Sequence, residues 1–502
     1  MFSAFVNCIK ISELRQKIVL TLVLLFVARI GANIPLPGID TSPLNEFMLT
    51  KAAGAGGLLG MFNMFTGGAL MKGAIFGLGI MPYISASIIL QLLSAINPSL
   101  ARIHQEGESG RQRIAQYTRY TTILICIIQG FLLVMALANY PEKLFYGFDS
   151  VQFGDIVVVN KMSFFVTSTI FLTAGTMALV WLGDQITQYG IGNGVSLLIA
   201  AGILSSMPTA VSQAIMLLRA PVGVEGGSLG LWHGLLMLIL LFSVVALMIA
   251  VTQADRRIPV QYVNRVVGRK MYGGQSSYLP LKINYSGVMP VIFASAILLF
   301  PQQIFAYIGA SAGIKFFQKI SAALNHGSST YYVIYGTMIL CFSYFWVSMM
   351  FRPIQIADDL KKNGGYVPGV RPGNDTAKFL DFVMTRLTLA GALFLTLIAL
   401  LPDFVCFVCG IPYSIALFFG GTGTLIAVGV ILDTMKQVEG YLLQKNYDGF
   451  MKKGRIRSRS AVDSLTKDKS RFFSKFKFGL WVSIAGSVVA VLLWAFRGFG
   501  EK

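Results

Sequence analysis

The sequence predicts an all-α polytopic membrane protein, a bundle of helices that cross a bilayer. Of its 502 residues, 55% are hydrophobic and only 13% are charged, and in both respects the chain departs from a soluble globular domain. Several apolar runs reach the roughly 20 residues that a helix needs to cross the hydrocarbon core. A motif repeated 208 positions apart indicates that the scaffold is duplicated.

We expect eleven spans. In chain order they cover residues 18–36, 75–95, 121–138, 163–183, 194–211, 232–252, 287–306, 332–351, 384–401, 412–432 and 478–496. The last run holds nineteen residues without a charge, with Trp481 and Trp494 near its two ends, where aromatic residues meet the membrane interfaces. A helix along the inner membrane surface is the alternative. Its apolar residues would then lie on one face, whereas here they surround the helix, which favours a crossing.

The distribution of basic residues predicts the orientation. If the chain starts in the cytoplasm, the cytoplasmic segments hold 31 of the 41 Lys and Arg residues, as the positive-inside rule requires. The net charge of +19 is then mostly cytoplasmic, including a basic tract at 451–477. Such a surface suits nucleic acid, anionic lipid or an acidic partner, and charge alone does not choose among them.

The repeated motif opens an apolar run in each half of the chain. Residues 81–90 (MPYISASIIL) and 289–298 (MPVIFASAIL) are identical at seven of ten positions. Each proline stands where a helix can begin without losing a hydrogen bond. Membrane proteins built from such repeats usually place their working site where the halves meet.

The stretch 58–70 is apolar but too short to cross the membrane. One interpretation is a surface loop or interfacial turn. The other is a half-helix folded back into the protein, because irregular backbone at membrane depth needs protein or a wet cavity beside it. In that case the chain carries its own stopper.

Two long cytoplasmic loops, 252–286 and 352–386, are rich in basic residues. Turn signals at 364–365, 368–369 and 372–373 surround Arg371 and predict that it projects from a tip. Basic loops would satisfy the orientation rule without any further role. The crowding of turns around one arginine nevertheless favours a docking site.

The sequence offers no catalytic or metal-binding constellation. It lacks a Gly-x-x-x-x-Gly-Lys-Ser/Thr phosphate loop, His104, His233 and His326 are dispersed, and the five cysteines form no zinc-finger pattern. We therefore expect no enzyme activity and no cofactor. An ion-coupled transporter is an alternative, but it needs ionisable groups near the midplane, and the Asp and Glu residues fall in loops or at helix ends.

Five motifs, in order along the chain, resemble signatures of the SecY family. They are residues 79–93 (GIMPYISASIILQLL), 190–194 (GIGNG), 256–262 (RRIPVQY), 367–373 (VPGVRPG) and 419–422 (FGGT). The resemblance implies ten helices in two inverted five-helix halves, residues 1–212 and 213–450. Residues 451–502 depart from the family pattern, and we expect them to form a basic tail with an eleventh transmembrane helix.

The resemblance also implies a function, the central protein-conducting channel of the Sec translocon. Such a channel passes unfolded secretory polypeptides across the membrane and releases membrane segments sideways through a lateral gate. The helices 80–95 and 288–306 would form this gate, with Pro82, Ala86, Ser87, Pro290, Ala294 and Ser295 on them. Small residues there permit close backbone approach.

Further site residues follow from the same resemblance. The pore ring would consist of Ile80, Ile84, Val195, Ile199, Ile292 and Ile426. The plug would include Leu58, Met61, Phe62, Asn63, Met64, Phe65, Thr66, Gly67 and Gly68. Docking of a motor or ribosome would use Arg256, Arg257, Arg269, Lys270 and Arg371.

The resemblance implies partners and a location. The partners are SecE-type and SecG-type small membrane subunits, a SecA-type ATPase, the ribosome, signal sequences with nascent polypeptides, and membrane lipid. Ribosomal RNA would be held through phosphate contacts from Lys and Arg. The location is a bacterial-type inner (plasma) membrane, crossed several times with the N-terminus in the cytoplasm.

Overall fold

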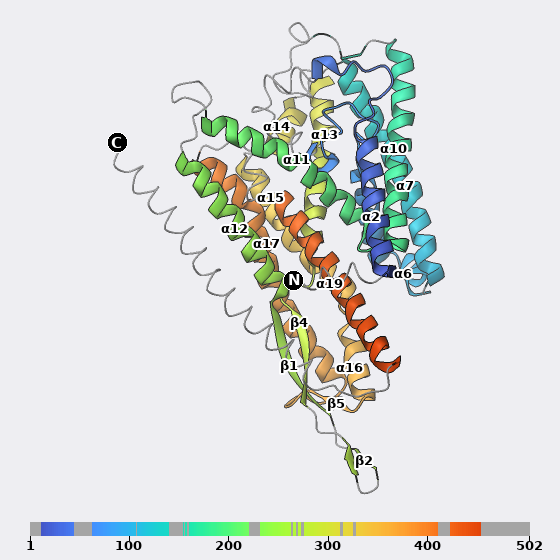
Figure 1. The fold of residues 1–502 in the computed structure, drawn as a ribbon, viewed down its shortest axis with the longest axis vertical. Helices are drawn as coiled ribbons and strands as arrows, with labels where there is room; N and C mark the ends of the chain where they lie inside the picture. The colour runs from blue at the N-terminus through green and yellow to red at the C-terminus, as the bar shows by residue number, and fades with distance from the viewer. Residues whose placement is uncertain are drawn as a thin grey trace, which may run out of the picture.

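The structure is a computed structural model. It describes residues 12–44, 63–106, 108–139, 154, 156–157, 160–219, 231–262, 265–267, 270–272, 276–311, 315–324, 328–409 and 422–452. Long helices dominate this part of the chain (Figure 1). They are α2 (Ser12–Gly31), α5 (Met81–Ile96), α7 (Glu108–Asn139), α10 (Lys161–Tyr189), α11 (Gly194–Arg219), α12 (Leu231–Gln253), α13 (Met289–Ser311), α15 (Ser329–Met350), α17 (Asn374–Cys409) and α19 (Thr422–Lys452). Shorter helices are α6 (Pro98–Gln105), α14 (Lys315–Ala323) and α16 (Pro353–Lys362).

Each of the first ten expected spans overlaps one long helix, so the expectation of a helical polytopic fold is confirmed. The eleventh, 478–496, lies outside the described residues. Five of the described helices contain a stretch long and apolar enough to cross a membrane, namely Gln112–Asn139, Lys161–Tyr189, Gly194–Met216, Ser329–Lys362 and Asn374–Leu401. Shorter apolar helical stretches are Met81–Ile96, Met237–Gln253 and Met289–Leu298.

Two expected boundaries were wrong. The first helix ends at Gly31 and not at residue 36, because the chain turns there and Pro35 pairs with Ala74 in an isolated bridge. The second begins at Met81 and not at residue 75, because residues 67–80 form a series of turns. Hydropathy measures only whether a segment is apolar. Apolar turns inside the protein score as high as a helix does, so hydropathy does not locate the helix ends.

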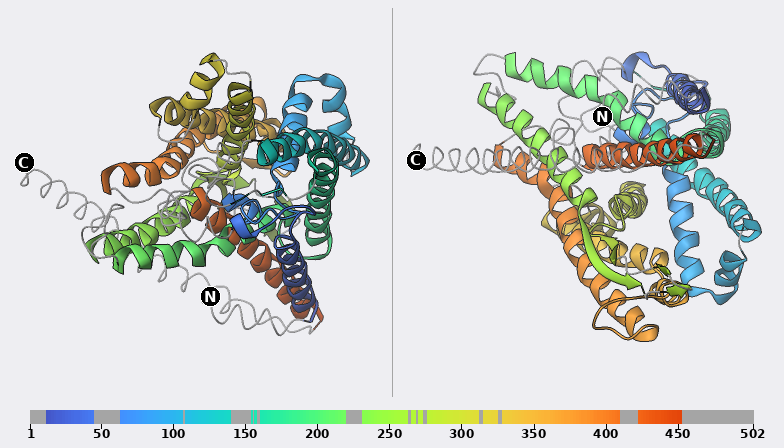
Figure 2. Two further views of the ribbon diagram at one scale, coloured as in Figure 1. Left: turned by 90° about the horizontal axis from the view of Figure 1, so that it is seen from above. Right: turned by 60° about the horizontal axis from the view of Figure 1, so that its bottom comes forward.

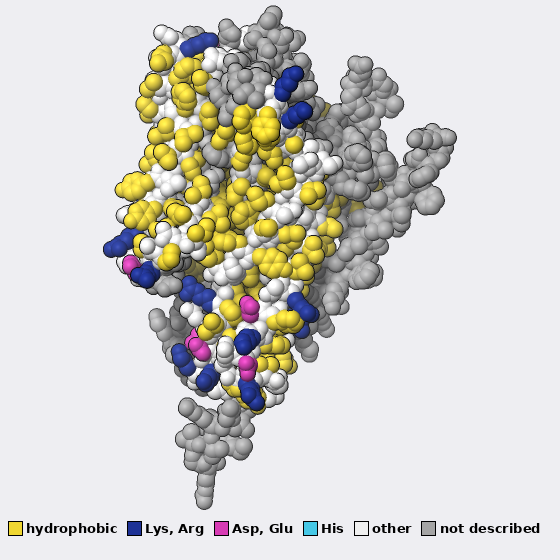
Figure 3. Space-filling model, turned by 180° about the vertical axis from the view of Figure 1, so that it is seen from behind, with side chains coloured by type: hydrophobic (Ala, Val, Ile, Leu, Met, Phe, Trp, Pro, Cys, Tyr) yellow, Lys and Arg dark blue, Asp and Glu magenta, His cyan; other side chains and the backbone are white. Residues whose placement is uncertain are grey.

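Hydrophobic side chains cover the outside of the helix bundle (Figure 3). Phe26 is 66% exposed and Val333 is 69% exposed, which in water would create an aggregation-prone surface. In the view of Figure 3, Lys, Arg, Asp and Glu side chains gather mainly at the lower end, where the loops lie. This pattern suits a bundle whose middle faces lipid.

The loops 252–286 and 352–386 contain β-structure that the sequence analysis did not predict. Strands β1 (Asp255–Tyr262), β4 (Ser276–Lys282) and β5 (Gly365–Tyr366) form an antiparallel sheet in the order β4-β1-β5. A hairpin of β2 (Arg265–Val267) and β3 (Lys270–Tyr272) lies at the lower tip (Figure 1). The all-α expectation therefore holds for the bundle, and the sheet joins the two loops into one protrusion.

The two halves of the chain contact each other along two seams. One seam is α5 against α13, and the other is α11 against α19. Within the first half α7 packs on α5 and α10, and within the second α15 packs on α13 and α17. Figure 2 shows these helices grouped around the centre of the bundle. The predicted boundary after residue 212 falls inside α11, which continues to Arg219.

The repeated motif is also a repeated backbone structure. Gly79 and Gly287, each three residues before a repeated proline, both have positive φ, +58° and +64°, a conformation that glycine adopts without strain. The amide of Ile84 donates to the carbonyl of Ile80 (3.1 Å), and the amide of Ile292 donates to that of Val288 (3.3 Å). The same turn thus starts α5 and α13, the two helices of one seam.

Candidate functional site

The six residues expected to form the pore ring meet in one buried hydrophobic cluster. Four elements contribute them: the start of α5, α11, α13 and α19. Ile80, Ile84, Ile199, Ile292 and Ile426 are buried members, with Ile426 fully inaccessible, whereas Val195 is partly buried and packs against them. Apolar side chains from both halves therefore close the centre of the bundle.

Val288 belongs to the same cluster and was missed by the sequence analysis. It is buried, and it packs so closely on Gly429 of α19 that a Cβ there would overlap it. The repeat could have identified it, because Val288 occupies in the second motif the place that Ile80 occupies in the first.

The described part of the expected plug lies against this cluster. Residues 63–66 form one helical turn, and the positive φ of Gly67 and Gly68 then reverses the chain. Met64 is 2% exposed, and Phe65 and Thr66 are also buried. Leu58, Met61 and Phe62 lie outside the described residues. Of the two interpretations of this stretch, its described end therefore supports a segment folded back into the protein.

Glycines in three elements form the seat of this segment. A Cβ on Gly202 of α11 would lie 2.8 Å from the carbonyl oxygen of Phe65, and one on Gly423 of α19 would lie 2.7 Å from Sδ of Met64. A Cβ on Gly79 would lie 3.0 Å from Thr66. The segment thus sits where α11 and α19 meet, next to the turn that starts α5.

Asn63 and Thr66 hold the segment together by local hydrogen bonds. The carbonyl of Asn63 accepts from the amide of Gly68 (2.9 Å), and its side-chain Oδ1 accepts from the amide of Met71 (3.3 Å). Thr66 Oγ1 donates to the carbonyl of Asn63 (3.1 Å). These bonds satisfy backbone groups that no helix or strand pairs, as a buried turn requires.

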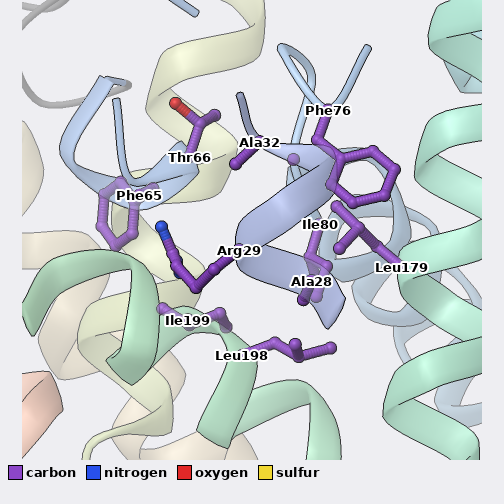
Figure 4. Close-up of a pocket in the computed structure, with 11 residues that line it drawn as sticks. Ala28, Arg29, Ala32, Phe65, Thr66, Phe76, Ile80, Leu179, Leu198 and Ile199 are labelled. Atoms are coloured by element: carbon purple, nitrogen blue, oxygen red, sulfur yellow. The ribbon is translucent and has the colours of Figure 1, made fainter. Parts of the chain in front are cut away.

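Arg29 is the second residue that the sequence analysis missed at this site. It falls within the first expected span, and it extends from α2 toward Phe65 and Thr66 inside the bundle (Figure 4). Together with Ile80 and Ile199 these residues line a cavity of about 30 Å³, which has room for about two water molecules. A cation therefore lies directly beside the apolar cluster.

The six expected gate residues lie along the α5–α13 seam. Pro82, Ala86, Pro290, Ala294 and Ser295 are buried, and Ser87 is half-buried. Ser295 Oγ donates to the carbonyl of Ile292 on its own helix (2.9 Å), so the hydroxyl needs no hydrogen-bond acceptor on the neighbouring helix. Ala86, Ala294 and Ser295 are thus small, buried side chains on the two helices that meet at this seam.

The expected docking residues are distributed over the protrusion that these two loops form. Arg256 and Arg257 are exposed on β1, and Arg257 Nε lies 3.3 Å from Asp255. Alternation places Ile258 and Val260 of the same strand in the interior. Lys270 lies on β3, and Arg269 lies outside the described residues.

Arg371 is exposed in the tight turns of the second loop. Gly364, Gly369 and Gly373 each have positive φ (+70°, +83° and +103°), and the Arg371 carbonyl accepts a hydrogen bond from Thr376 Oγ1 (2.8 Å). Tyr366 Oη donates to Gln261 Oε1 (3.0 Å), a bond that ties this loop to β1. The arginine therefore sits on a rigid tip rather than on a free loop.

No group of three or more His, Cys, Asp or Glu residues in the described part of the chain is placed to hold a metal ion. The described residues thus offer a packed apolar cluster, a segment seated beside it, a half-buried arginine and a basic protrusion.

Comparisons with known proteins agree with this arrangement. The family model described as SecY matches residues 74–435. The protein translocase subunit SecY of Escherichia coli (strain K12) is 42% identical over 447 residues, which cover 89% of this chain and 96% of that protein.

Solved structures share the fold. One described as "The structure of a protein conducting channel" has a TM-score of 0.53 at 20% identity, covering 84% of this chain and 91% of that one. An idle yeast Ssh1 complex bound to the yeast 80S ribosome has a TM-score of 0.54 at 17% identity, covering 86% and 89%. By the extent of the family match and the identity to a curated relative, the chain belongs to the SecY family.

Proposed function

We propose that this chain is the central protein-conducting channel of a Sec-type translocon, which moves unfolded secretory polypeptides across the membrane. The observation that carries the proposal is the closed neck: apolar side chains of four elements meet at the centre of the bundle, with the segment 63–68 seated beside them. A solute transporter would instead need coordinating groups at this depth.

An apolar neck suits both tasks of such a channel. A narrow hydrophobic constriction excludes ions because water leaves it, and it gates by wetting. It also presents no hydrogen-bonding group to which a passing peptide could adhere. Ile84 and Ile292 start α5 and α13 at equivalent positions of the repeat, so separation of these helices would widen the neck and open the seam together.

The α5–α13 seam is the proposed lateral gate. Ala86, Ala294 and Ser295 allow the backbones to approach closely when the gate is shut, and few large side chains must disengage when it opens. Phe293 on α13 instead packs edge-to-face on Phe342 and Trp346 of α15, with ring centroids 6.3 and 5.2 Å away. In this proposal α13 moves with α15 and leaves α5 behind.

Energy for transport comes from a partner in this proposal, and the chain itself has no catalytic role. The basic protrusion with Arg256, Arg257 and Arg371 would dock a SecA-type ATPase or a ribosome, through carboxylates or rRNA phosphates respectively. The fold similarity to a ribosome-bound Ssh1 complex supports the ribosome as a candidate. SecE-type and SecG-type subunits would complete the assembly in the membrane.

The proposed location is a bacterial inner membrane with the N-terminus in the cytoplasm. Relatives are bacterial translocase subunits, and the charge asymmetry of the chain predicts this orientation. The sheet β4-β1-β5 and α16 then face the cytoplasm, and α14 at the opposite end of the bundle in Figure 1 faces outward.

Reconstitution tests the function. The chain is purified in gentle detergent with any small membrane subunits that accompany it, and placed in liposomes with a SecA-type ATPase, ATP and a secretory precursor. We expect precursor to become resistant to added protease, and liposomes without the chain serve as the control. Ion-coupled solute uptake by the chain, with no protected precursor, would contradict the proposal.

A further inference from the structure

Arg29 is a charged residue inside an apolar helix. Charged side chains within membrane segments are costly and usually functional. Here the side chain lines the cavity beside the neck together with Phe65, Thr66 and Ile199. Its Nε has no hydrogen-bond partner among the described residues, so the fold keeps a cation at this point without fully satisfying it.

The guanidinium joins three parts of the protein. Its Nη1 donates to Ser205 Oγ on α11 (2.8 Å) and lies 3.4 Å from the carbonyl oxygen of Gly67, at the end of the plug segment. Ser205 Oγ itself lies 3.5 Å from the same carbonyl. The contact to Gly67 is longer than an optimal hydrogen bond, so the attraction is mainly that of a positive charge for a carbonyl dipole in a half-buried site.

Gly67 makes this approach possible. Its φ is +65°, and a Cβ at this position would collide with the guanidinium of Arg29. The backbone conformation therefore favours glycine, and any larger residue would also push the Arg29 guanidinium away from its present position. Glycine, which has no Cβ, thus occupies the position whose carbonyl oxygen Arg29 contacts.

We propose that Arg29 is the latch that holds the plug segment in its seat while the channel rests. This inference rests on the proposed channel function and adds the residue that restrains the plug. When the segment leaves, Arg29 keeps Ser205 as a partner, and water that enters the opened neck can solvate Nε, which is unsatisfied at rest. The polar part of release therefore costs little more than one charge-assisted contact, in addition to the apolar contacts of Met64 and Phe65.

A second contact between the same two parts of the chain provides a matched control. Lys72 Nζ donates to Asn33 Oδ1 (2.6 Å), joining the end of α2 to the turns that follow the plug segment. Both residues are exposed, so this contact contributes little. For Ser205 the control is its neighbour Ser206, whose hydroxyl donates only within α11, to the carbonyl of Ile203 (2.9 Å).

The test measures exposure of the plug directly. In a cysteine-free background carrying Thr66→Cys, the rate of labelling by a membrane-impermeant maleimide added from outside is recorded, together with the resting ion conductance in planar bilayers. We expect Arg29→Gln to raise the labelling rate about 10- to 100-fold, the range for loss of a hydrogen bond from a charged donor. Ser205→Ala should raise it about 3- to 10-fold.

The pattern among variants separates a latch from general loosening. The Arg29→Gln/Ser205→Ala double variant should label no faster than Arg29→Gln alone, because both changes break one bridge. Lys72→Ala and Ser206→Ala should change the rate by no more than about twofold. If Arg29→Gln does not assemble, the milder Ser205→Ala against Ser206→Ala decides the same question.

Three results would overturn the latch. They are unchanged labelling in Arg29→Gln, equal effects of Ser205→Ala and Ser206→Ala, and independent effects that multiply in the double variant. A ring variant in which Ile84, Ile199, Ile292 and Ile426 are all replaced by Ser distinguishes the levels of the argument. If the ring variant raises the resting conductance but Arg29→Gln changes neither conductance nor labelling, only the latch is rejected. If neither variant changes the conductance, the proposed channel seal is rejected as well.

Discussion

Gly202 on α11 provides the sharpest test of the plug seat. A Cβ at this position would lie 2.8 Å from the carbonyl oxygen of Phe65, closer than real Cβ contacts. The obstructing atom belongs to the backbone of the plug segment and not to a flexible side chain. Gly202→Ala should therefore displace the segment from its seat.

The size of the effect follows from two terms. Overpacking a tight site costs about 1–3 kcal/mol. Replacing a helix-interior glycine by alanine also stabilises the helix by about 1 kcal/mol, but this gain applies equally with the plug seated or displaced and cancels from the plug equilibrium. The displaced population should therefore rise about 5- to 150-fold.

Hydrogen exchange of the plug segment measures this population. The amide of Gly68 donates to the carbonyl of Asn63 (2.9 Å), and its exchange rate reports how often the segment opens. Gly440→Ala on α19 is the matched control, because a Cβ there meets nothing within 4 Å. Gly423→Ala should give a smaller effect, since its neighbour is the flexible end of Met64.

Two outcomes would refute this reasoning. Equal exchange at Gly68 in Gly202→Ala and Gly440→Ala would mean that the plug does not rest on α11 in the membrane. A larger effect of Gly423→Ala than of Gly202→Ala would mean that side-chain packing, and not backbone approach, defines the seat.

Three further predictions concern the neck, the gate and the protrusion. Replacing Ile84, Ile199, Ile292 and Ile426 together by Ser should raise resting conductance in planar bilayers by wetting the neck; an unchanged conductance would show that these residues do not form the seal. A verified disulfide between one cysteine on α5 and one on the facing side of α13 should stop insertion of signal sequences, whereas each single-cysteine variant should insert normally; insertion through the crosslink would reject the gate. Arg371→Glu should weaken SecA-type ATPase or ribosome binding, more strongly at low salt, while Lys319→Glu, an exposed charge reversal on α14 at the other end, should not; equal binding by both variants would reject docking at Arg371.

Most of the helical scaffold could be predicted because hydropathy and charge are properties of the chain itself. Apolar runs identify segments that lipid or a core will accept, and ten of them became long helices in the described residues. The repeated Met-Pro motif correctly marked two helices that meet at a seam. The positive φ of Gly79 and Gly287 shows that the repeat encodes a turn as well as a helix start.

The sheet of the protrusion could not be predicted by the same means. Strand β1 buries only Ile258 and Val260, too short an alternation to stand out in a loop read mainly for its charge. Its partners lie far along the chain, as the pair Arg257–Pro280, 23 positions apart, and the pair Gln261–Tyr366 from a different loop show. Such pairing depends on the helices that bring the loops together.

The contacts at the neck show most clearly what a linear sequence leaves open. Arg29 contacts Gly67 and Ser205, 38 and 176 positions away, and its position near the end of an apolar run made it resemble an interfacial arginine. Only when the chain stops being helical at Gly31 and returns through residues 63–80 does this cation face a backbone carbonyl in place of water. The same return brings Phe65 onto Gly202 and Met64 onto Gly423. A resemblance can therefore nominate a plug, but the contacts on which the proposed seat and latch rest, from backbone to glycine and from one arginine, become visible only when the segments are placed together.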